Sequence, residues 1–399
     1  MNDLPIKLKL KESFFEAETI CDYEVTTESK QLWAVLLDLM VTFDAVCKQY
    51  NIRYSIDSGT LLGAVRHGGF IPWDNDADVI MLRSEYNKLC AVAPTAFAEP
   101  YFWQTNDTDP GSMRRHGQLR NSQTTCILTS ETSDGTPLFH YNQGVFLDVF
   151  ILDEVPDDVE ERHRFQDELQ HALGELWDFK KFYADSHLSP WMEKAQKQAY
   201  DNFETLVARY NGTGQKRVGN IALIPQRKDS LFFLKELYED LIEYEFEGYT
   251  FAGPRDYETI LSGHYGDWHQ LVRGAGDAHG EIILDLRNSY RHYLKPQASQ
   301  RADAKERIQH PILKLYRHRD MLLTERDRAW TDNRILQEKL TSCQQKSDVL
   351  RSELNDAINV KARLEKKEKK HLKVIRLMIG ISLLFLILSL ILLWRITTI

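Results

Sequence analysis

Paired cysteines are missing from this chain of 399 residues. Its 5 cysteines are odd in number, scattered and without a Cys-x-x-Cys pair, which argues against a disulfide framework and a cysteine-rich zinc site and favours a reducing compartment. An excess of positive charge is also missing, and the formal net charge of -9 gives no indication of a nucleic-acid partner. The N-terminal stretch MNDLPIKLKLKESFF has no apolar run, so we expect no signal peptide.

Charged residues are absent from one long stretch, the 18 residues from Leu377 to Trp394. As a helix this stretch would cover about 27 Å, close to the thickness of the hydrocarbon core of a bilayer. We therefore predict a transmembrane helix over residues 374–395 that anchors a single-pass membrane protein; a buried core helix is the alternative. Residues 361–376 carry eight Lys and Arg against two Glu, so the positive-inside rule predicts that the preceding chain is cytoplasmic.

Glycine and proline are absent between Pro311 and Gly380. Apolar or small residues recur there at every seventh position from Leu322 to Leu364, which predicts a long coiled-coil helix and allows a homo-oligomer. A single solvated helix is the alternative. The predicted division of the chain is an N-terminal extension (1–30), a globular domain (31–294), a linker (295–311), a coiled-coil helix (312–373) and the membrane anchor (374–395).

The globular domain mixes short β-rich runs with segments of helical periodicity. The clearest helix is SKQLWAVLLDLMVTFDAVCKQY, in which apolar residues follow the i, i+3, i+4 spacing of one helix face. SGTLLGAVRHGGF is expected to form a glycine-rich turn that leads into a helical turn. Strands or extended segments are expected at residues 51–57, 71–82 and 142–152, and helices at residues 29–50, 157–181 and 190–210.

Three aspartates crowd the segment IPWDNDADVIML. Side chains alternate faces in an extended chain, so Asp74, Asp76 and Asp78 should share one face at intervals of roughly 7 Å. Unpaired buried carboxylates would cost several kcal/mol, and a hard divalent cation such as Mg²⁺ (or Mn²⁺), which prefers oxygen ligands, would remove that cost. A solvated acidic turn is the alternative.

The residues on either side of this segment favour the metal interpretation. Upstream, Ser58, Gly59 and Thr60 form a turn whose backbone can approach a phosphate, and Arg66 follows about one helical turn later. Downstream, Asp148 is an isolated acid within the apolar run GVFLDVFIL. It could be a third metal ligand or take the proton from an attacking hydroxyl; an edge-strand surface residue is the alternative.

A family resemblance joins these features. The segment IDSGTLLGAVRHGGFIPWDNDADVIMLRSEY resembles the signature of the LicD family, which includes the fukutin-related proteins. HGQLRNSQTT, GVFLDVF and FEGYTFAGPRDYETILSGHYGDW are similar to later blocks of that family. The resemblance implies an α+β fold with a polymerase-β-like nucleotidyltransferase core and helical additions. It also implies transfer of a phospho-alcohol, such as phosphocholine, from a CDP-activated donor to a sugar hydroxyl.

The resemblance also implies roles for individual residues. Asp76 and Asp78 would be a metal-binding pair with Asp148 as the third acid. Asp74 would be a neighbouring acid that is less favoured as a metal ligand. Ser58, Gly59, Thr60 and Arg66 would form the phosphate-binding turn. Arg120 would face the donor phosphates, with a surface ion pair as the alternative. We expect His67 and His264 to be structural.

The resulting hypothesis is a Mg²⁺-dependent phosphotransferase on the cytoplasmic membrane face, acting on a cell-surface glycan or its lipid-linked precursor. Two alternatives remain at this point. The enzyme could transfer a nucleotide in place of a phospho-alcohol. The chain could instead be a membrane-anchored coiled-coil scaffold with an incidental transferase domain.

Overall fold

The computed structural model describes residues 3–133, 136–137, 141–185, 190–222, 229–272, 282–294, 366–367 and 369–384. The chain divides into two units, Met1–Ala304 and Lys305–Ile399, which are described separately. The predicted linker 295–311 lies outside the described residues, and so does the predicted coiled coil 312–373 apart from a few residues at its end.

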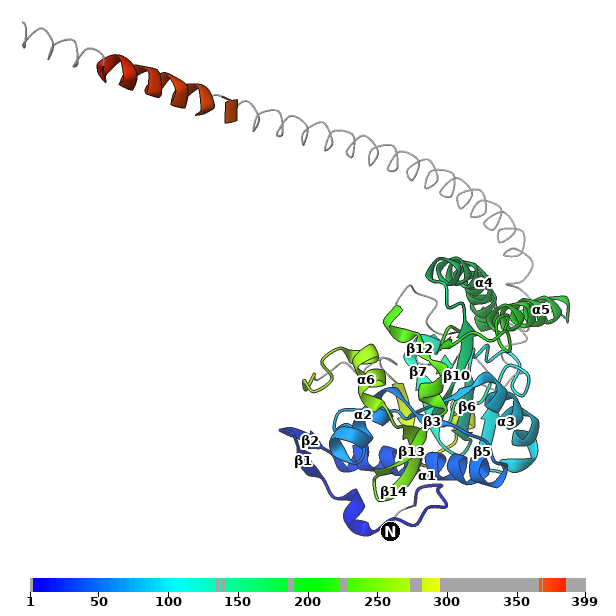
Figure 1. Ribbon diagram of the computed structural model, residues 1–399. Coiled ribbons are helices and arrows are strands. Elements are labelled where there is room, and N and C mark those ends of the chain that lie inside the picture. The colour runs from blue at the N-terminus through cyan, green and yellow to red at the C-terminus, as the bar shows by residue number, and fades with distance from the viewer. Residues whose placement is uncertain are drawn as a thin grey trace, which may run out of the picture. The chain divides into compact units, whose positions relative to one another are not determined.

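The described part of the second unit is helical over residues 369–384 (Figure 1). No helix among the described residues is long and apolar enough to cross a membrane. The last part of the predicted span, residues 385–395, lies outside the description. The described residues therefore give no support to the predicted anchor.

The first unit combines helices and strands, as the expected α+β class requires. Its α-helices are α1 (Thr27–Gln49), α2 (Ser58–His67), α3 (Arg83–Ala96), α4 (Val159–Asp185), α5 (Pro190–Val207) and α6 (Tyr257–Tyr265). Short 3-10 helices occupy Glu12–Phe15, Thr129–Glu131, Asp229–Leu231, Lys235–Tyr238 and Tyr290–His292. The strands are β1 (Glu18–Ile20), β2 (Tyr23–Val25), β3 (Ser55–Ile56), β4 (Asp78–Leu82), β5 (Tyr101–Gln104), β6 (Gly117–Asn121), β7 (Thr125–Leu128), β8 (Thr132–Ser133), β9 (Thr136–Pro137), β10 (Val145–Val155), β11 (Arg217–Gly219), β12 (Phe233–Leu234), β13 (Leu241–Phe246), β14 (Tyr249–Pro254) and β15 (Ile282–Asp285).

A seven-stranded sheet organises this unit around β10 (Figure 1). On one edge, β10 pairs in parallel with β4, and β3 lies beyond β4. On its other edge, the first half of β10 pairs with β6 and its last residues pair with β11, both antiparallel. The strand is therefore buried on both edges, which suits its almost continuous apolar sequence.

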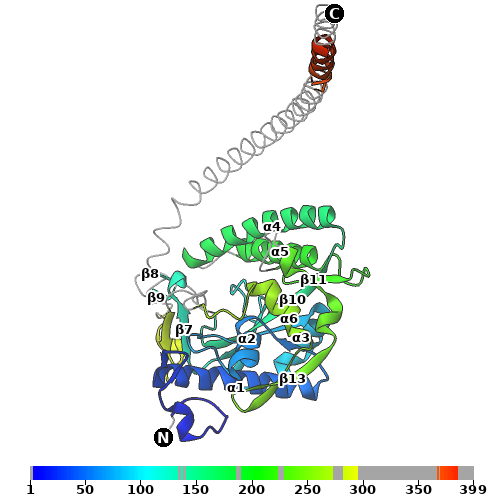
Figure 2. The same cartoon turned by 60° about the vertical axis from the view of Figure 1, so that its left-hand side comes forward.

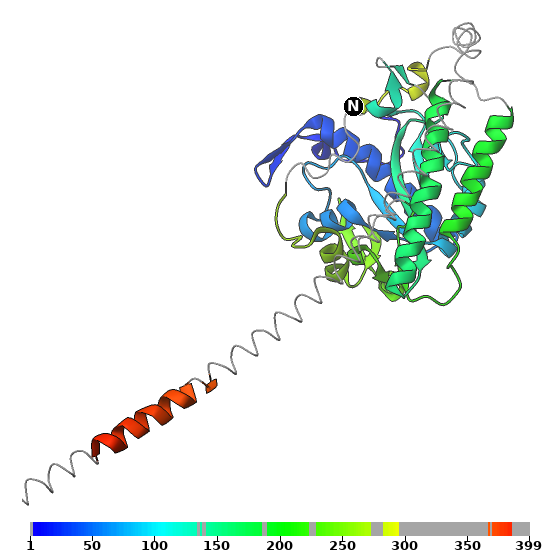
Figure 3. The ribbon, with the colours of Figure 1, turned by 90° about the horizontal axis from the view of Figure 1, so that it is seen from above.

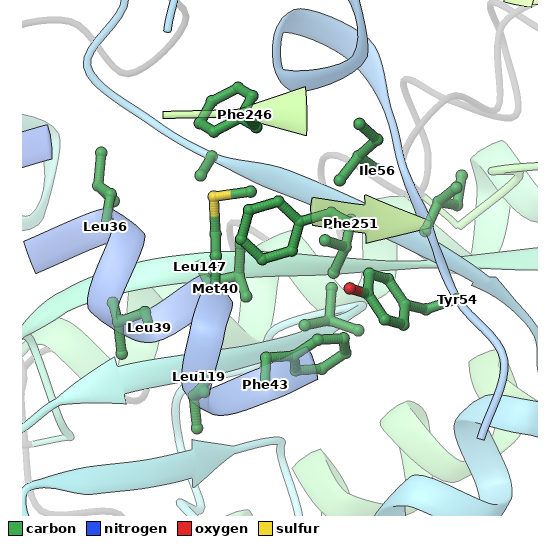
Figure 4. Packing of buried hydrophobic residues seen from close by; sticks show 14 of the residues in the cluster. Leu36, Leu39, Met40, Phe43, Tyr54, Ile56, Leu119, Leu147, Phe246 and Phe251 are labelled. Carbon is green, nitrogen blue, oxygen red and sulfur yellow. The ribbon is translucent and has the colours of Figure 1, made fainter. Parts of the chain in front are cut away.

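Helix α1 confirms the helix expected at residues 29–50. It begins after Thr26, whose hydroxyl accepts a hydrogen bond of 3.2 Å from the backbone N–H of Ser29 and caps the helix. Its apolar residues pack against β6 and β10, and Leu36, Met40 and Phe43 lie beside strand residues in the main core (Figure 4). Burial of apolar side chains of this kind stabilises a fold by about 1.5–3 kcal/mol each.

Helices α4 and α5, which confirm the helices expected at 157–181 and 190–210, lie side by side at the opposite end of the unit from α1 (Figures 2 and 3). They bury a second, smaller core that includes Phe165, Leu169 and Phe203. This core also contains Ile221 and Phe232, the latter directly before β12, so the helix pair packs against these residues.

The predicted strands at residues 51–57 and 71–82 are shorter in the structure. Only Ser55–Ile56 and Asp78–Leu82 form strands, and a turn precedes β4, closed by a hydrogen bond of 2.9 Å from Asp74 N–H to the Ile71 carbonyl. Pro72 has no N–H to give to a sheet, which favours the turn over a longer strand. Trp33 of α1 donates to the Asp74 carbonyl at 3.0 Å and holds this turn against the core.

Candidate active site

One cavity of about 650 Å³ collects most of the predicted site residues. Asp74, Asp76 and Asp78 line it from the turn and β4, and Asp148 lines it from β10. Ser58, Gly59 and Arg66 line it from α2. The further lining residues used below are Asp57, Trp73, Asn220, Phe232, Phe233, Tyr238, His264, Tyr265 and Trp268.

The alternation predicted for the acidic segment is present, although the backbone is a strand only from Asp78 onward. Asp74, Asp76 and Asp78 all line the cavity, while Ala77 between them is buried in the main core. Thr60 fixes the last of these acids, because its hydroxyl accepts a hydrogen bond of 2.8 Å from the Asp78 N–H. Thr60 is therefore a support behind the acids and does not line the cavity.

Asp148 lies directly beside Asp78, because the two are register partners in the parallel pair β4–β10. Parallel partners point to the same face of a sheet, and neighbouring strands are about 4.8 Å apart. The Asp148 N–H also donates to the Ala77 carbonyl at 3.1 Å. The structure thus brings together two of the acids expected in the site, although they are far apart in the sequence.

Two side chains hold the Asp148 carboxylate from the other edge of β10. His116 Nε2 lies 2.8 Å from Asp148 Oδ1, and the Gln118 amide donates to the same oxygen at 2.6 Å. Gln118 is the register partner of Asp148 on β6, so its position follows from the sheet. The sequence motif HGQLR was noted for its arginine, but its histidine and glutamine are the residues in contact with an acid of the site.

Arg120, which we expected to face the donor phosphates, does not line the cavity. It is only 1% exposed and donates to Gln104 Oε1 at 2.5 Å, to the Gly144 carbonyl at 2.6 Å and to Gln118 Oε1 at 2.5 Å. Burial lowers the pKa of Arg120 to about 10. Its structural place is behind Gln118, where it orients the side chain that holds Asp148.

Crowded negative charge dominates the electrostatics of the cavity. Burial, followed by the charge of Asp76, raises the pKa of Asp74 to about 8. Burial also raises the pKa of Asp78 well above its ordinary value, and the charges of Asp76 and Asp148 add to the shift. The pKa of Tyr265 is raised by burial and then by the surrounding aspartates, so its hydroxyl keeps its proton. A bound cation would reverse the effect on the acids.

The turn at the start of α2 lies close to these acids. A Cβ atom on Gly59 would lie 2.6 Å from Asp74 Oδ2, so any larger residue would displace the carboxylate from its close approach to the backbone. The first N–H groups of a helix have no partner within it and favour anions. Arg66, on the last turn of α2, donates to the carbonyls of Trp268 and Gln270 at 3.2 and 3.4 Å and so ties α2 to the segment after α6.

The side chains that line the cavity supply the carboxylate oxygens that a hard divalent cation prefers as ligands. The cavity is lined by six aspartates and by one arginine, Arg66, and by no lysine among the described residues. Within the described parts of the chain, however, no three Asp, Glu, His or Cys side chains are arranged as a complete metal-binding group. Mg²⁺ sites that act on phosphates commonly take only one or two carboxylates and complete the shell with water and phosphate oxygens, so these residues fit that kind of site.

Several cavity residues were missed from the sequence. Asp57 is fully buried directly before the phosphate-binding turn, and burial raises its pKa. His264, expected to be only structural, lines the cavity, with Nε2 3.8 Å from Asp57 Oδ2. Asp57 ends the short run NIRYSID before a glycine turn, and that position could have marked it. Trp268 ends the block FEGYTFAGPRDYETILSGHYGDW, which resembles the family, but no role was expected for it; nothing in the local pattern marks Asn220.

Comparisons with known proteins agree with the geometry. Residues 51–135 match the family described as LicD/FKTN/FKRP, nucleotidyltransferase domain. The chain is 26% identical over 281 residues to the lipopolysaccharide cholinephosphotransferase LicD of Haemophilus influenzae. This match covers 62% of this chain and 93% of that protein. Over 59 residues it is 42% identical to the uncharacterized protein RP689 of Rickettsia prowazekii, and this match covers 15% of this chain and 22% of that protein. A match of 59 residues to the uncharacterized protein RT0683 of Rickettsia typhi is 46% identical and covers 15% of this chain and 19% of that protein.

The match over residues 51–135 includes the glycine turn, the three clustered aspartates and the His116–Gln118 segment. Asp148 and α6 lie beyond it, yet the structure places both against the matched part. The signature, the domain match at residues 51–135 and the long match to a cholinephosphotransferase agree in one respect: this chain contains a domain that matches the LicD/FKTN/FKRP nucleotidyltransferase family.

Proposed function

We propose that this protein transfers a phospho-alcohol of the phosphocholine type from a CDP-activated donor to a sugar hydroxyl of a cell-surface glycan or its lipid-linked precursor. The name of its relative, a lipopolysaccharide cholinephosphotransferase, supports the reaction class. The observation that carries the proposal is the meeting of Asp76, Asp78 and Asp148 with the start of α2 in one cavity. That arrangement is suited to holding a pyrophosphate beside an attacking hydroxyl.

We assign the donor phosphates to the N-terminal turn of α2 and to Arg66. The N–H groups of Ser58 and Gly59 would bind phosphate oxygens, and the Arg66 guanidinium would neutralise part of their charge. Asp76 and Asp78 would hold Mg²⁺ or Mn²⁺ within a polymerase-β-like nucleotidyltransferase core. The ion would supply charge stabilisation at the transferring phosphoryl group.

The reaction then needs one bond made and one broken. The acceptor oxygen bonds to the phosphorus that carries the alcohol, and the bond from that phosphorus to the CMP leaving group breaks. The hydroxyl proton passes to a carboxylate, for which Asp148 is best placed because His116 and Gln118 fix one of its oxygens. Positioning of this kind, more than covalent chemistry, accounts for most catalysis of phosphoryl transfer.

The proposal is tested by replacing Asp76 or Asp78 with Asn and measuring transfer from CDP-choline to a glycan acceptor. We expect kcat/KM to fall at least about 100-fold, as when one electrostatic contact to a transition state is lost. Asp240→Asn is the matched control, because Asp240 forms an exposed ion pair with Arg255 at 2.9 Å and lies outside the cavity.

Two further measurements complete this test. EDTA should abolish transfer, and added Mg²⁺ or Mn²⁺ should restore it. The mass gained by the acceptor separates phosphocholine transfer from nucleotidyl transfer. Folded Asp76→Asn and Asp78→Asn proteins with unchanged activity would remove the assignment of the acidic cluster.

A further inference from the structure

Three residues that line the cavity each carry a buried polar atom that lacks a hydrogen-bond partner within the described parts of the chain. These atoms are the side-chain oxygen of Asn220, Nε2 of His264 and Nε1 of Trp268. Nearly all buried polar atoms in folded proteins are paired, because an unpaired one forfeits the hydrogen bond it made in water. Three such atoms around one cavity indicate a ligand that supplies the missing partners.

A fourth group lies next to this set. The Asp57 carboxylate accepts a hydrogen bond of 3.0 Å from the Ser58 hydroxyl, while His264 Nε2 is 3.8 Å from Asp57 Oδ2. A separation of 3.8 Å is too long for a hydrogen bond. The histidine and the aspartate therefore both line the cavity without forming a hydrogen bond to each other.

The walls around these atoms are aromatic. Phe232, Phe233, Tyr238 and Tyr265 line the same cavity as Trp268, and the rings of Phe233 and His264 are 5.5 Å apart. An apolar wall with a few convergent polar groups is typical of a small-molecule site. The ligand should accordingly have apolar faces and a polar rim.

The donor or acceptor character of the unpaired atoms restricts the chemical class of the ligand. Trp268 Nε1 can only donate a hydrogen bond and the Asn220 oxygen can only accept one. An ammonium group has no acceptor for the Trp268 N–H, and a phosphate offers no proton to the Asn220 oxygen at neutral pH. A hydroxyl group both donates and accepts, and a sugar ring places several hydroxyls around an apolar face.

We propose that Asn220, His264 and Trp268 form a subsite for the hydroxyl groups of a sugar ring. This proposal rests on the proposed transferase function, which provides two reactants with such a ring: the ribose of the nucleotide donor and the acceptor sugar. The subsite lies on the segment after β11, on α6 and on the residues that follow α6, all beyond the matched domain at residues 51–135.

The test compares two tryptophan variants of the full chain. Trp268→Phe removes the cavity N–H and keeps an aromatic ring in place. Trp103→Phe is the matched control, because the Trp103 N–H is also buried, but the ring packs in the main core against Phe97 and Tyr86 and does not line the cavity. His264→Asn serves as a second cavity variant if Trp268→Phe lowers the thermal stability severely.

Binding is measured by calorimetry with CMP, with 2′-deoxy-CMP, and with glucose and galactose as free sugar probes. If the subsite holds the donor ribose, Trp268→Phe weakens CMP binding about tenfold, the equivalent of ~1.4 kcal/mol for one net hydrogen bond, and reduces the preference for CMP over 2′-deoxy-CMP. If it holds the acceptor, nucleotide binding stays unchanged while sugar binding weakens and the acceptor KM rises. Trp103→Phe should change neither.

The subsite assignment is overturned if Trp268→Phe and His264→Asn, both folded, bind the nucleotides and the sugars as the unaltered protein does. Failure of the proposed function gives a different result. In that case the unaltered protein binds one of these probes through Trp268 and yet transfers no phosphocholine.

Discussion

At the scale of single residues, the position of Asp148 depends on a chain of buried hydrogen bonds. Gln104 and Gln118 each accept a hydrogen bond of 2.5 Å from the Arg120 guanidinium. The amide N–H of Gln118 donates a hydrogen bond of 2.6 Å to Asp148 Oδ1. Partners of this kind, one contact removed from the reacting atoms, commonly change activity about 10–100-fold when they are lost. Gln118 should therefore be a positioning residue for Asp148.

We predict that Gln118→Leu lowers kcat about 10–100-fold, because Asp148 then loses a contact that fixes its carboxylate. Gln104→Leu is the matched control: it also removes a partner of Arg120 but leaves both contacts of Asp148 in place. Both variants should lower the melting temperature, since a buried arginine loses an acceptor in each case. Equal losses of kcat in the two variants, measured at saturating substrate, would contradict the role of Gln118.

The sequence predicted individual residues where the reason was local. The two-residue period of an extended chain predicted a common side for Asp74, Asp76 and Asp78, and all three line the cavity, although the backbone is a strand only from Asp78 onward. Arg120 was misplaced because a buried arginine in a strand has the same local pattern as an exposed one. His264 was expected to be structural, and its place in the cavity near Asp57 could not be read locally because the two residues are far apart in the sequence.

At the scale of elements, the placement of α2 is set by a glycine in its middle. A Cβ atom on Gly63 would lie 2.4 Å from the Gly69 carbonyl oxygen and 3.4 Å from the Ile71 backbone nitrogen. The helix therefore packs directly against the backbone that leads into the acidic turn. This close approach keeps the N-terminal end of α2 beside Asp74.

We predict that Gly63→Ala destabilises the protein by about 1–2 kcal/mol: the backbone clash outweighs the gain of up to ~1 kcal/mol that alanine normally brings to a helix. Activity should fall as well, because α2 must shift away from the acids. Gly174→Ala in α4 is the matched control, since nothing lies within 4 Å of its added Cβ, and it should stabilise the protein slightly. Urea unfolding measures both changes, and a Gly63→Ala protein as stable as the original would refute the packing argument.

The long helices were the elements most accessible from sequence. The apolar periodicity of α1 extends over several turns and predicts one buried face, which its core residues confirm. The strands before β10 were expected to be longer, because β-branched and alternating residues cannot show where pairing with another strand ends. Pro72 and the hydrogen bond between Asp74 and Ile71 form a turn before β4, so the strand begins only at Asp78.

At the scale of the whole molecule, the site depends on contacts that no local pattern contains. Asp78 and Asp148 are brought together by the parallel pairing of β4 with β10, and α6 reaches the cavity after the α4–α5 pair and β11 to β14 have intervened in the chain. The family resemblance anticipated the pairing of the acids, but not the wall formed by Asn220, His264 and Trp268. All the cavity residues nevertheless lie within the first unit, Met1–Ala304.

That location predicts how a shortened chain behaves. A protein of residues 1–304 contains both hydrophobic cores and every described residue of the cavity, so it should fold with little change in melting temperature and transfer phosphocholine to an acceptor in solution. A scaffold whose transferase domain is incidental would show no such turnover. A folded but inactive 1–304 protein would mean that residues 305–399 take part in the reaction.

The same shortened chain separates catalysis from membrane attachment. If residues 374–395 anchor the protein as their sequence predicts, confinement to a bilayer raises the effective concentration of a lipid-linked acceptor. The full chain in vesicles should then show a lower apparent KM for such an acceptor than the 1–304 protein, while both act alike on a soluble sugar acceptor. Because tethering changes encounter and leaves the cavity unaltered, kcat should be the same for the two proteins. Equal KM values for the lipid-linked acceptor would argue against the anchor and leave the assignment of the cavity unaffected.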